Sequence, residues 1–128
     1  MTLKQWLVAS MTFVSLLSSA YAAGPATTRH QLLSNDKTKV WEAVIYPGKH
    51  QELSMHRHDY PRVLIALNDG MLKITNDKGE SRLLKLNQGK AYFFPRDTAN
   101  ELHTDENLSQ HAMKMFVVEL RDQTQQKT

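Results

Sequence analysis

Short strand-like segments separated by turn residues constrain the fold of this chain more than any other feature. Residues 39–46 alternate loosely between apolar and polar side chains and end at Pro47-Gly48. Residues 62–67 are almost wholly apolar, as in a strand buried on both faces, and Asn68-Asp69-Gly70 follows as a turn. A hydrophobic period of two, with Gly, Asn and Asp between the runs, indicates strands rather than helices.

The same pattern continues to the end of the chain. It predicts further strands at residues 52–58, 71–75, 81–86, 91–94, near Leu102 and at 113–120. About eight short strands at this spacing, without a convincing helix, predict an all-β domain, either an antiparallel sandwich or a small barrel. The aromatic residues of such a domain belong mainly to its core: Trp41, Tyr92, Phe93 and Phe94.

The first 23 residues are expected to be a signal peptide and not part of the fold. Lys4 is followed by an apolar stretch from Trp6 to Leu17, and Ala20-Tyr21-Ala22 has the small-x-small pattern of a cleavage site. The apolar stretch is short for a membrane span. We therefore expect cleavage and a periplasmic or secreted protein with no stable membrane anchor.

Length and composition allow one domain in the remainder. The chain has 128 residues, 41% hydrophobic and 23% charged. We expect an N-terminal arm at 24–37, a barrel at 38–122 and a flexible tail at 123–128. The chain has no cysteine, which excludes disulfides, thiolate chemistry and lipid attachment at cysteine.

The basic isoelectric point does not indicate nucleic-acid binding. The sequence pI is about 9.2. Lys4 is the one basic residue of the first 23, so 15 Lys and Arg face 13 Asp and Glu in the rest of the chain. These basic residues are scattered, without a run or interleaved aromatic residues, and no nucleic-acid partner is expected.

The candidate site is marked by His56-Arg57-His58 and by a later segment, His103-Thr104-Asp105-Glu106-Asn107. Two histidines at i and i+2 of a strand point to the same face, and a third from a neighbouring strand completes a facial metal site. The other histidines, His30, His50 and His111, are expected to be ordinary polar residues. The alternative is a degenerate site, in which the histidines hydrogen-bond inside an empty barrel.

These residues resemble the cupin superfamily, in particular the small single-domain cupins with an RmlC-like jelly-roll barrel. Gly48, His56, His58 and Gly70 follow the order of its first motif, and Gly89, Pro95 and the His103-x3-Asn107 half follow its second. The resemblance covers about residues 40 to 120. It implies an antiparallel β-barrel, a metal held by histidines in its mouth and a possible homodimer.

Two spacings depart from the family's motifs. The Gly48–His56 spacer is longer by two residues, and the Pro95–His103 interval is longer by three, with Asp97 where the family has Gly. In strict register the third ligand would fall on Asn100, which leaves Asn100 as a candidate ligand-binding residue. We favour His103, because it restores the spacing to Asn107.

The family's metal-binding Glu is replaced by Arg62, or by Val63 if the longer spacing holds. Arg cannot ligate a metal but offers a fork for carboxylate or phosphate. Arg62 lies four residues after His58, an even offset that points it to the same face, although Pro61 could mark a bulge that turns it outward. The alternative role for Arg62 is an ion pair with Asp59 or Glu101 at the rim of the barrel.

Together the residues and the resemblance predict one divalent transition metal (Fe, Zn, Mn, Ni or Cu) on His56, His58 and His103, and a small anionic ligand at Arg62. The activity that the resemblance implies is that of a metal-dependent dioxygenase or isomerase. A non-catalytic binding module for an anion and a protein-interaction barrel with a relic site remain the alternatives.

Overall fold

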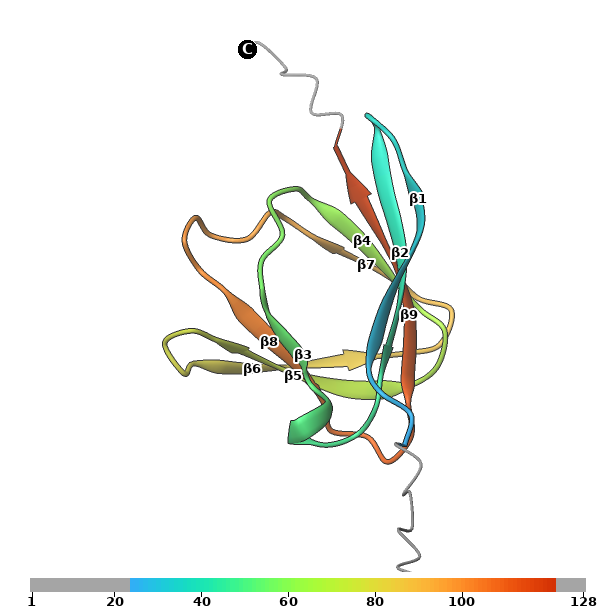
Figure 1. Cartoon of the computed structure of the whole chain (residues 1–128), viewed down its shortest axis with the longest axis vertical. Coiled ribbons are helices and arrows are strands. Elements are labelled where there is room, and N and C mark those ends of the chain that lie inside the picture. Colours follow the sequence, from blue (N-terminus) through green and yellow to red (C-terminus); the bar gives the residue numbers. More distant parts are fainter. Residues whose placement is uncertain (1–23, 122–128) are drawn as a thin grey trace, which may run out of the picture.

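Two antiparallel β-sheets face each other and curve into a barrel in the computed structural model, which describes residues 24–121 (Figure 1). The predicted all-β antiparallel class is confirmed. In the described range there are nine strands and one short 3-10 turn, η1 (Lys49–Gln51). The strands are β1 (Thr28–Ser34), β2 (Thr38–Ile45), β3 (Leu53–His56), β4 (Arg62–Ala66), β5 (Gly70–Asn76), β6 (Ser81–Leu86), β7 (Ala91–Phe94), β8 (His103–Asn107) and β9 (Met113–Leu120).

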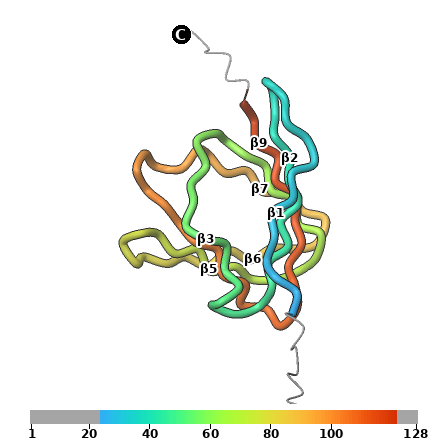
Figure 2. Tube along the Cα trace, viewed as in Figure 1, coloured from blue at the N-terminus to red at the C-terminus, as the bar shows by residue number. Residues whose placement is uncertain are grey.

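The strand order is that of a jelly roll, in which the chain passes repeatedly from one sheet to the other. One sheet has the order β1-β2-β9-β4-β7 and the other β3-β8-β5-β6. The strands surround a central space, and the β3–β4 and β7–β8 connections lie on the same side of it (Figure 2). Two hydrogen bonds join these connections. Asp97 N donates to His58 O at 2.9 Å, and His58 N donates to the carboxylate of Asp97.

Every second side chain along the central strands points inward and fills the space between the sheets. Along β9 every second residue is buried, and β4 buries Arg62, Leu64 and Ala66 while its other residues are half-buried. The fully buried core consists of Trp41, Ala43, Ile45, Leu64, Ala66, Leu72, Leu86, Met113, Met115 and Val117. Because β2, β4 and β9 supply most of this list, the core lies against the centre of the five-stranded sheet.

Asn107 lies at the opposite end of β8 from His103 and is buried. Its side chain is 1% exposed, donates from Nδ2 to Ile45 O (2.8 Å) and His111 O (2.7 Å), and accepts from Ser109 N (2.8 Å). A buried amide with its donors and acceptor satisfied fixes the backbone segments that it joins. The Asn of the His-x3-Asn pattern therefore has a structural role.

The hydrophobic pattern of the sequence did not predict strand β1. Residues 24–37 were expected to be an arm, but Thr28–Ser34 pairs with β2 along its length, with an irregularity between Gln31 and Leu33. All seven residues of β1 are exposed. A strand without a buried face leaves no period-two signal, so the hydrophobic pattern could not reveal it.

The predicted signal peptide and C-terminal tail lie outside the described residues, which begin at residue 24 and end at 121. Among the described residues, no helix has the length and apolar character needed to cross a membrane.

Candidate metal centre

Three histidines converge in the barrel. His56 lies at the end of β3, His58 two residues beyond it, and His103 at the start of β8. One ring nitrogen from each lies within 4.8 Å of the others. The ring centroids of His56 and His103 are 4.4 Å apart, and those of His56 and His58 are 5.0 Å apart. The structure thus brings together the three residues predicted as metal ligands.

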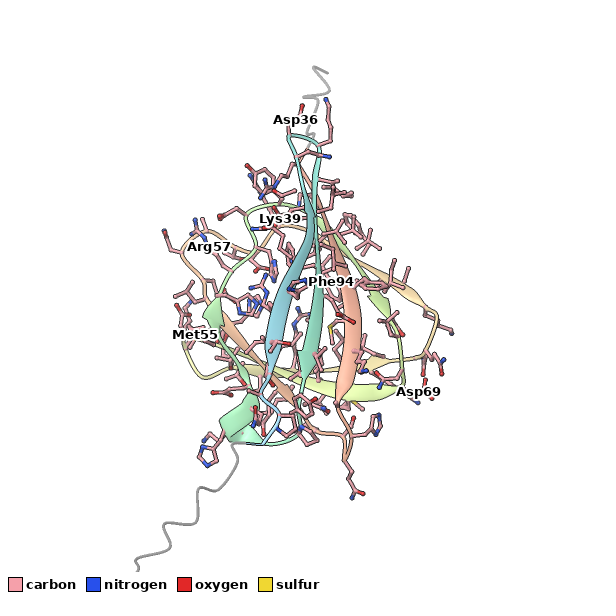
Figure 3. The ribbon with its side chains drawn as sticks, turned by 45° about the vertical axis from the view of Figure 1, so that its right-hand side comes forward. Asp36, Lys39, Met55, Arg57, Asp69 and Phe94 are labelled. Carbon is pink, nitrogen blue, oxygen red and sulfur yellow. The ribbon has the colours of Figure 1, made fainter. Side chains whose placement is uncertain are left out.

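The backbone explains how these side chains meet. His56 and His103 are direct cross-strand partners in the β3–β8 pair, so their side chains share a face. The intervening residues Met55 and Arg57 lie on the outside of the barrel (Figure 3), with Met55 47% exposed. The alternation that places His56 and His58 on one side therefore continues past the end of the strand.

The Nδ1 atoms of two of the histidines are already engaged. His56 Nδ1 lies 2.7 Å from the carbonyl oxygen of Ser54, which can only accept a hydrogen bond. His103 Nδ1 lies 3.4 Å from Asp97 Oδ2. The Ser54 carbonyl keeps the proton of a neutral His56 on Nδ1. The nearest carboxylate of His103 is on its Nδ1 side, 3.4 Å away against 3.9 Å on the Nε2 side, which favours the same tautomer. Both rings are thus oriented to present Nε2 to a metal.

His58 is held by packing. It is 8% exposed, and its ring stacks on the Trp41 indole with centroids 5.8 Å apart and planes 5° apart. Burial, aided by the nearby positive charge of Arg62, lowers the pKa of His58 from 6.5 to about 2. Burial also lowers the pKa of His103, although Asp105 and Asp97 oppose this effect. Both rings are therefore neutral at physiological pH, as metal ligation requires.

Asp97 connects the parts of the site, and the sequence analysis noted it only as a departure from a motif. Its Oδ2 accepts the backbone N–H of His58 at 2.7 Å and faces His103 Nδ1, while its Oδ1 lies 3.2 Å from Arg62 Nη1. The side chain is 17% exposed. One carboxylate thus holds two of the three histidine positions and pairs with a buried cation.

Arg62 lies on the histidines' side of the barrel, as its even offset from His58 predicted. It is 7% exposed, and Pro61 does not turn it outward. Its partners are Asp97 and the carbonyl oxygen of Pro95 (3.1 Å) rather than Asp59 or Glu101. Asp59 instead forms a surface ion pair with Arg57 at 2.8 Å. The guanidinium also lies 5.3 Å from the centre of the Phe94 ring.

Asn100 does not join the cluster. It is exposed, has a φ of 63° and lies in the loop before β8, which accommodates the longer spacing. The third position is filled by His103, the residue that the sequence analysis favoured. His30, His50 and His111 are exposed and lie outside the cluster, and His111 Nε2 contacts Asp69 O at 2.7 Å.

The histidines border a small cavity between the sheets. Its volume is about 40 Å³, and its wall also includes Arg29, Arg82 and Asp105. About 10–15 Å³ is enough for one water, so the cavity fits an ion with a few small ligands. A shallower cleft of about 280 Å³ shares Arg62, Arg82, Phe94 and His103 with the cavity and extends to Glu101. A larger molecule would therefore place only its head group beside the histidines.

Solved structures of other proteins show which fold this is. A cupin domain from Bordetella pertussis matches with a TM-score of 0.63 and 23% identity, covering 78% of this chain and 98% of that one. A cupin superfamily protein from Desulfitobacterium hafniense matches with a TM-score of 0.56 and 16% identity over 90% and 95% of the two chains. An RmlC-like cupin family protein from Methanocaldococcus jannaschii, with a double-stranded β-helix fold, has a TM-score of 0.56 and 18% identity over 74% and 80%.

The chain therefore has the cupin fold, as the resemblance of its histidine motifs predicted. No protein-family profile and no curated protein matches the sequence.

The role of Asp97 can be tested by Asp97→Asn. This change leaves the charge of Arg62 unpaired in a largely buried site, and we expect it to lower the free energy of unfolding by about 3 kcal/mol. The matched control is Asp59→Asn, because Asp59 pairs with Arg57 at the surface with its side chain 63% exposed. Such pairs contribute at most about 1 kcal/mol. Equal effects of the two variants in urea unfolding would contradict this account.

The buried state of His58 predicts a pH dependence of stability in protein treated with a chelator. Between pH 6.5 and about 2 the unfolded chain binds a proton at His58 that the folded protein does not, so stability falls as the pH falls. At pH 5 the loss relative to pH 8 is about 2 kcal/mol from this residue. His58→Gln should flatten the slope measured by urea unfolding, and His30→Gln should leave it unchanged. The opposite ranking would show that His58 titrates normally.

Proposed function

We propose that this protein is a metal-binding cupin that holds one divalent transition-metal ion on His56, His58 and His103. The observation that supports this most is that one ring nitrogen of each histidine lies within 4.8 Å of the others. The Nε2 atoms of His56 and His103 lie 3.5 and 3.9 Å from the same oxygen of Asp105. Imidazole ligands suit Zn, Cu, Fe and Ni, and Mn is also compatible with a mixed site.

We further propose that the site acts on a small anionic molecule. Two guanidinium groups, those of Arg62 and Arg82, lie 5.3 and 5.9 Å from the centre of the Phe94 ring, where the cavity and the cleft meet. Asp97 pairs with Arg62, whereas in residues 24–121 no carboxylate forms an ion pair with Arg82. Arg82 therefore offers the fork that a carboxylate or phosphate would bind, with Arg62 beside it.

The chemistry proposed for the site is oxygenase- or isomerase-like. A bound metal would polarise a substrate oxygen or activate a small co-ligand. The chain's own residues would bind the anionic group at Arg82 and Arg62 and restrict the access of water through the small cavity. Glu101 borders the cleft and is the carboxylate best placed to accept a proton from the outer part of a substrate. A non-catalytic anion-binding module with the same residues is the second candidate.

The location that we propose, periplasmic or secreted, rests on residues 1–23 alone. Lys4, the apolar stretch and Ala20-Tyr21-Ala22 support export and cleavage.

Elemental analysis of the purified protein tests the metal proposal. We expect close to one transition-metal ion per chain, and we expect His56→Ala or His58→Ala to abolish binding, because each removes one imidazole from the group. His50→Ala is the matched control, since His50 is exposed and outside the cluster. Protein without metal that also takes up none of Fe, Zn, Mn, Ni or Cu on titration would overturn the proposal.

The anion proposal predicts the effect of Arg82→Met. Oxalate and inorganic phosphate serve as probes in calorimetry with metal-loaded protein, and we expect the variant to weaken their binding about tenfold, the equivalent of losing about 1.4 kcal/mol. Arg62→Met should weaken it roughly ten- to a hundredfold while metal uptake stays equal or improves. Arg57→Met is the control, because Arg57 pairs with Asp59 at the surface and lines neither the cavity nor the cleft. Unchanged affinity in both Arg82→Met and Arg62→Met would remove the anionic substrate from the proposal.

A further inference from the structure

Asp105 lies beside the histidine group without having been singled out by any motif. It is on β8 two residues after His103, so the two side chains point to the same face of the sheet. Its Oδ2 is 3.5 Å from His56 Nε2 and 3.9 Å from His103 Nε2. The side chain is 13% exposed and borders the cavity.

The atoms that face one another here are all hydrogen-bond acceptors when the histidines are neutral. His56 directs Nδ1 at the Ser54 carbonyl and His103 directs Nδ1 at Asp97, so each Nε2 presents a lone pair. Asp105 adds a carboxylate oxygen to these two lone pairs, with no donor between them. Such a convergence of acceptors is repulsive unless a cation lies among them.

The separations fit ligands of one ion better than a hydrogen bond. The Ser54 carbonyl takes the Nδ1 proton of a neutral His56, so Nε2 has none to donate across the 3.5 Å to Asp105. The 3.9 Å to His103 Nε2 is too long for a hydrogen bond. Two ligands of a tetrahedral ion with bonds of 2.0–2.1 Å stand about 3.4 Å apart. A small movement of the Asp105 side chain would therefore bring its oxygen to coordinating distance from an ion held by both Nε2 atoms.

The charges of the surrounding side chains give a reason for a carboxylate at this position. Arg62, which stands where the family's first motif has Glu, is a buried cation, and Arg29 also lies in the cavity wall. The charge of Asp105 acts on both of these arginines, so it lies near enough to compensate for them. A dication held by neutral imidazoles alone would face this positive surrounding without an anion of its own.

We propose that Asp105 is the fourth protein ligand of the metal, so that the centre has three imidazoles and one carboxylate, the carboxylate coming from β8 rather than from β4. This inference rests on the metal centre proposed above. It also limits the open positions on the ion to those left after four protein ligands, so that a substrate or co-ligand occupies at most two in an octahedral ion.

Metal affinity and ligand-field spectra of Asp105→Asn test the proposal. Zn²⁺ affinity is measured by competition with a chromophoric chelator, and Co²⁺-loaded protein is recorded in the visible region. We expect Asp105→Asn to bind Zn²⁺ at least tenfold more weakly and to change the intensity and position of the Co²⁺ bands. The matched control is Glu106→Gln, the next residue of β8, whose side chain belongs to the opposite face of the strand.

The possible outcomes separate this inference from the metal centre itself. If the unaltered protein binds Zn²⁺, and Asp105→Asn binds it equally well with an unchanged Co²⁺ spectrum, Asp105 is not a ligand and the three-histidine centre stands. If the unaltered protein binds neither ion, both proposals fail. Should Asp105→Asn not fold, Asp105→Ala provides the second variant, and a Co²⁺ spectrum identical to that of the unaltered protein would overturn the inference.

Discussion

The Asp97 carboxylate is the interaction on which the rest of the site depends. It accepts the backbone N–H of His58, faces Nδ1 of His103 and pairs with Arg62. These three residues come from the β3–β4 connection, from β8 and from β4, so one side chain ties together segments from both sheets. Without this anion, the loop before β8 would keep the backbone bond from Asp97 N to His58 O but lose its side-chain contacts to the histidine positions. Arg62 would keep only the Pro95 carbonyl and lose its ion-pair partner.

Two carboxylates compensate for positive charge at the site, Asp97 near the rim and Asp105 beside the histidines. Asp97 compensates for Arg62, and that pair also orients His103. Asp105 lies among neutral imidazole nitrogens and close to Arg29. Asp97 and Asp105 therefore offset part of the positive charge that Arg62 and Arg29 place beside the histidines. Arg82 forms no ion pair in residues 24–121, and this unpaired positive charge is the one that the proposed anionic ligand would neutralise.

Local sequence patterns predicted those features that residues close together in the chain determine, namely the strand bounds and the shared face of His56 and His58. The bounds predicted for β6 and β7 agree with the structure, and the two-residue spacing of His56 and His58 correctly placed both in the barrel. β1 was missed because none of its residues is buried. The pairing of Arg62 with Asp97 and the approach of Asp105 to His56 join residues far apart in sequence, and only the fold reveals them. The choice between Asn100 and His103 depended in the same way on the path of a loop.

The stacking of Trp41 has a consequence for how the protein can be observed. The chain has two tryptophans, and the other is Trp6, in the segment expected to be removed on export. Trp41 is 4% exposed, with the Arg29 guanidinium 4.6 Å from its ring centre and the His58 ring stacked against it. In the mature chain, indole fluorescence would thus come from a single residue in direct contact with a proposed ligand. The protein would carry its own optical reporter, since quenching by a paramagnetic ion falls steeply with distance and this indole lies beside the site.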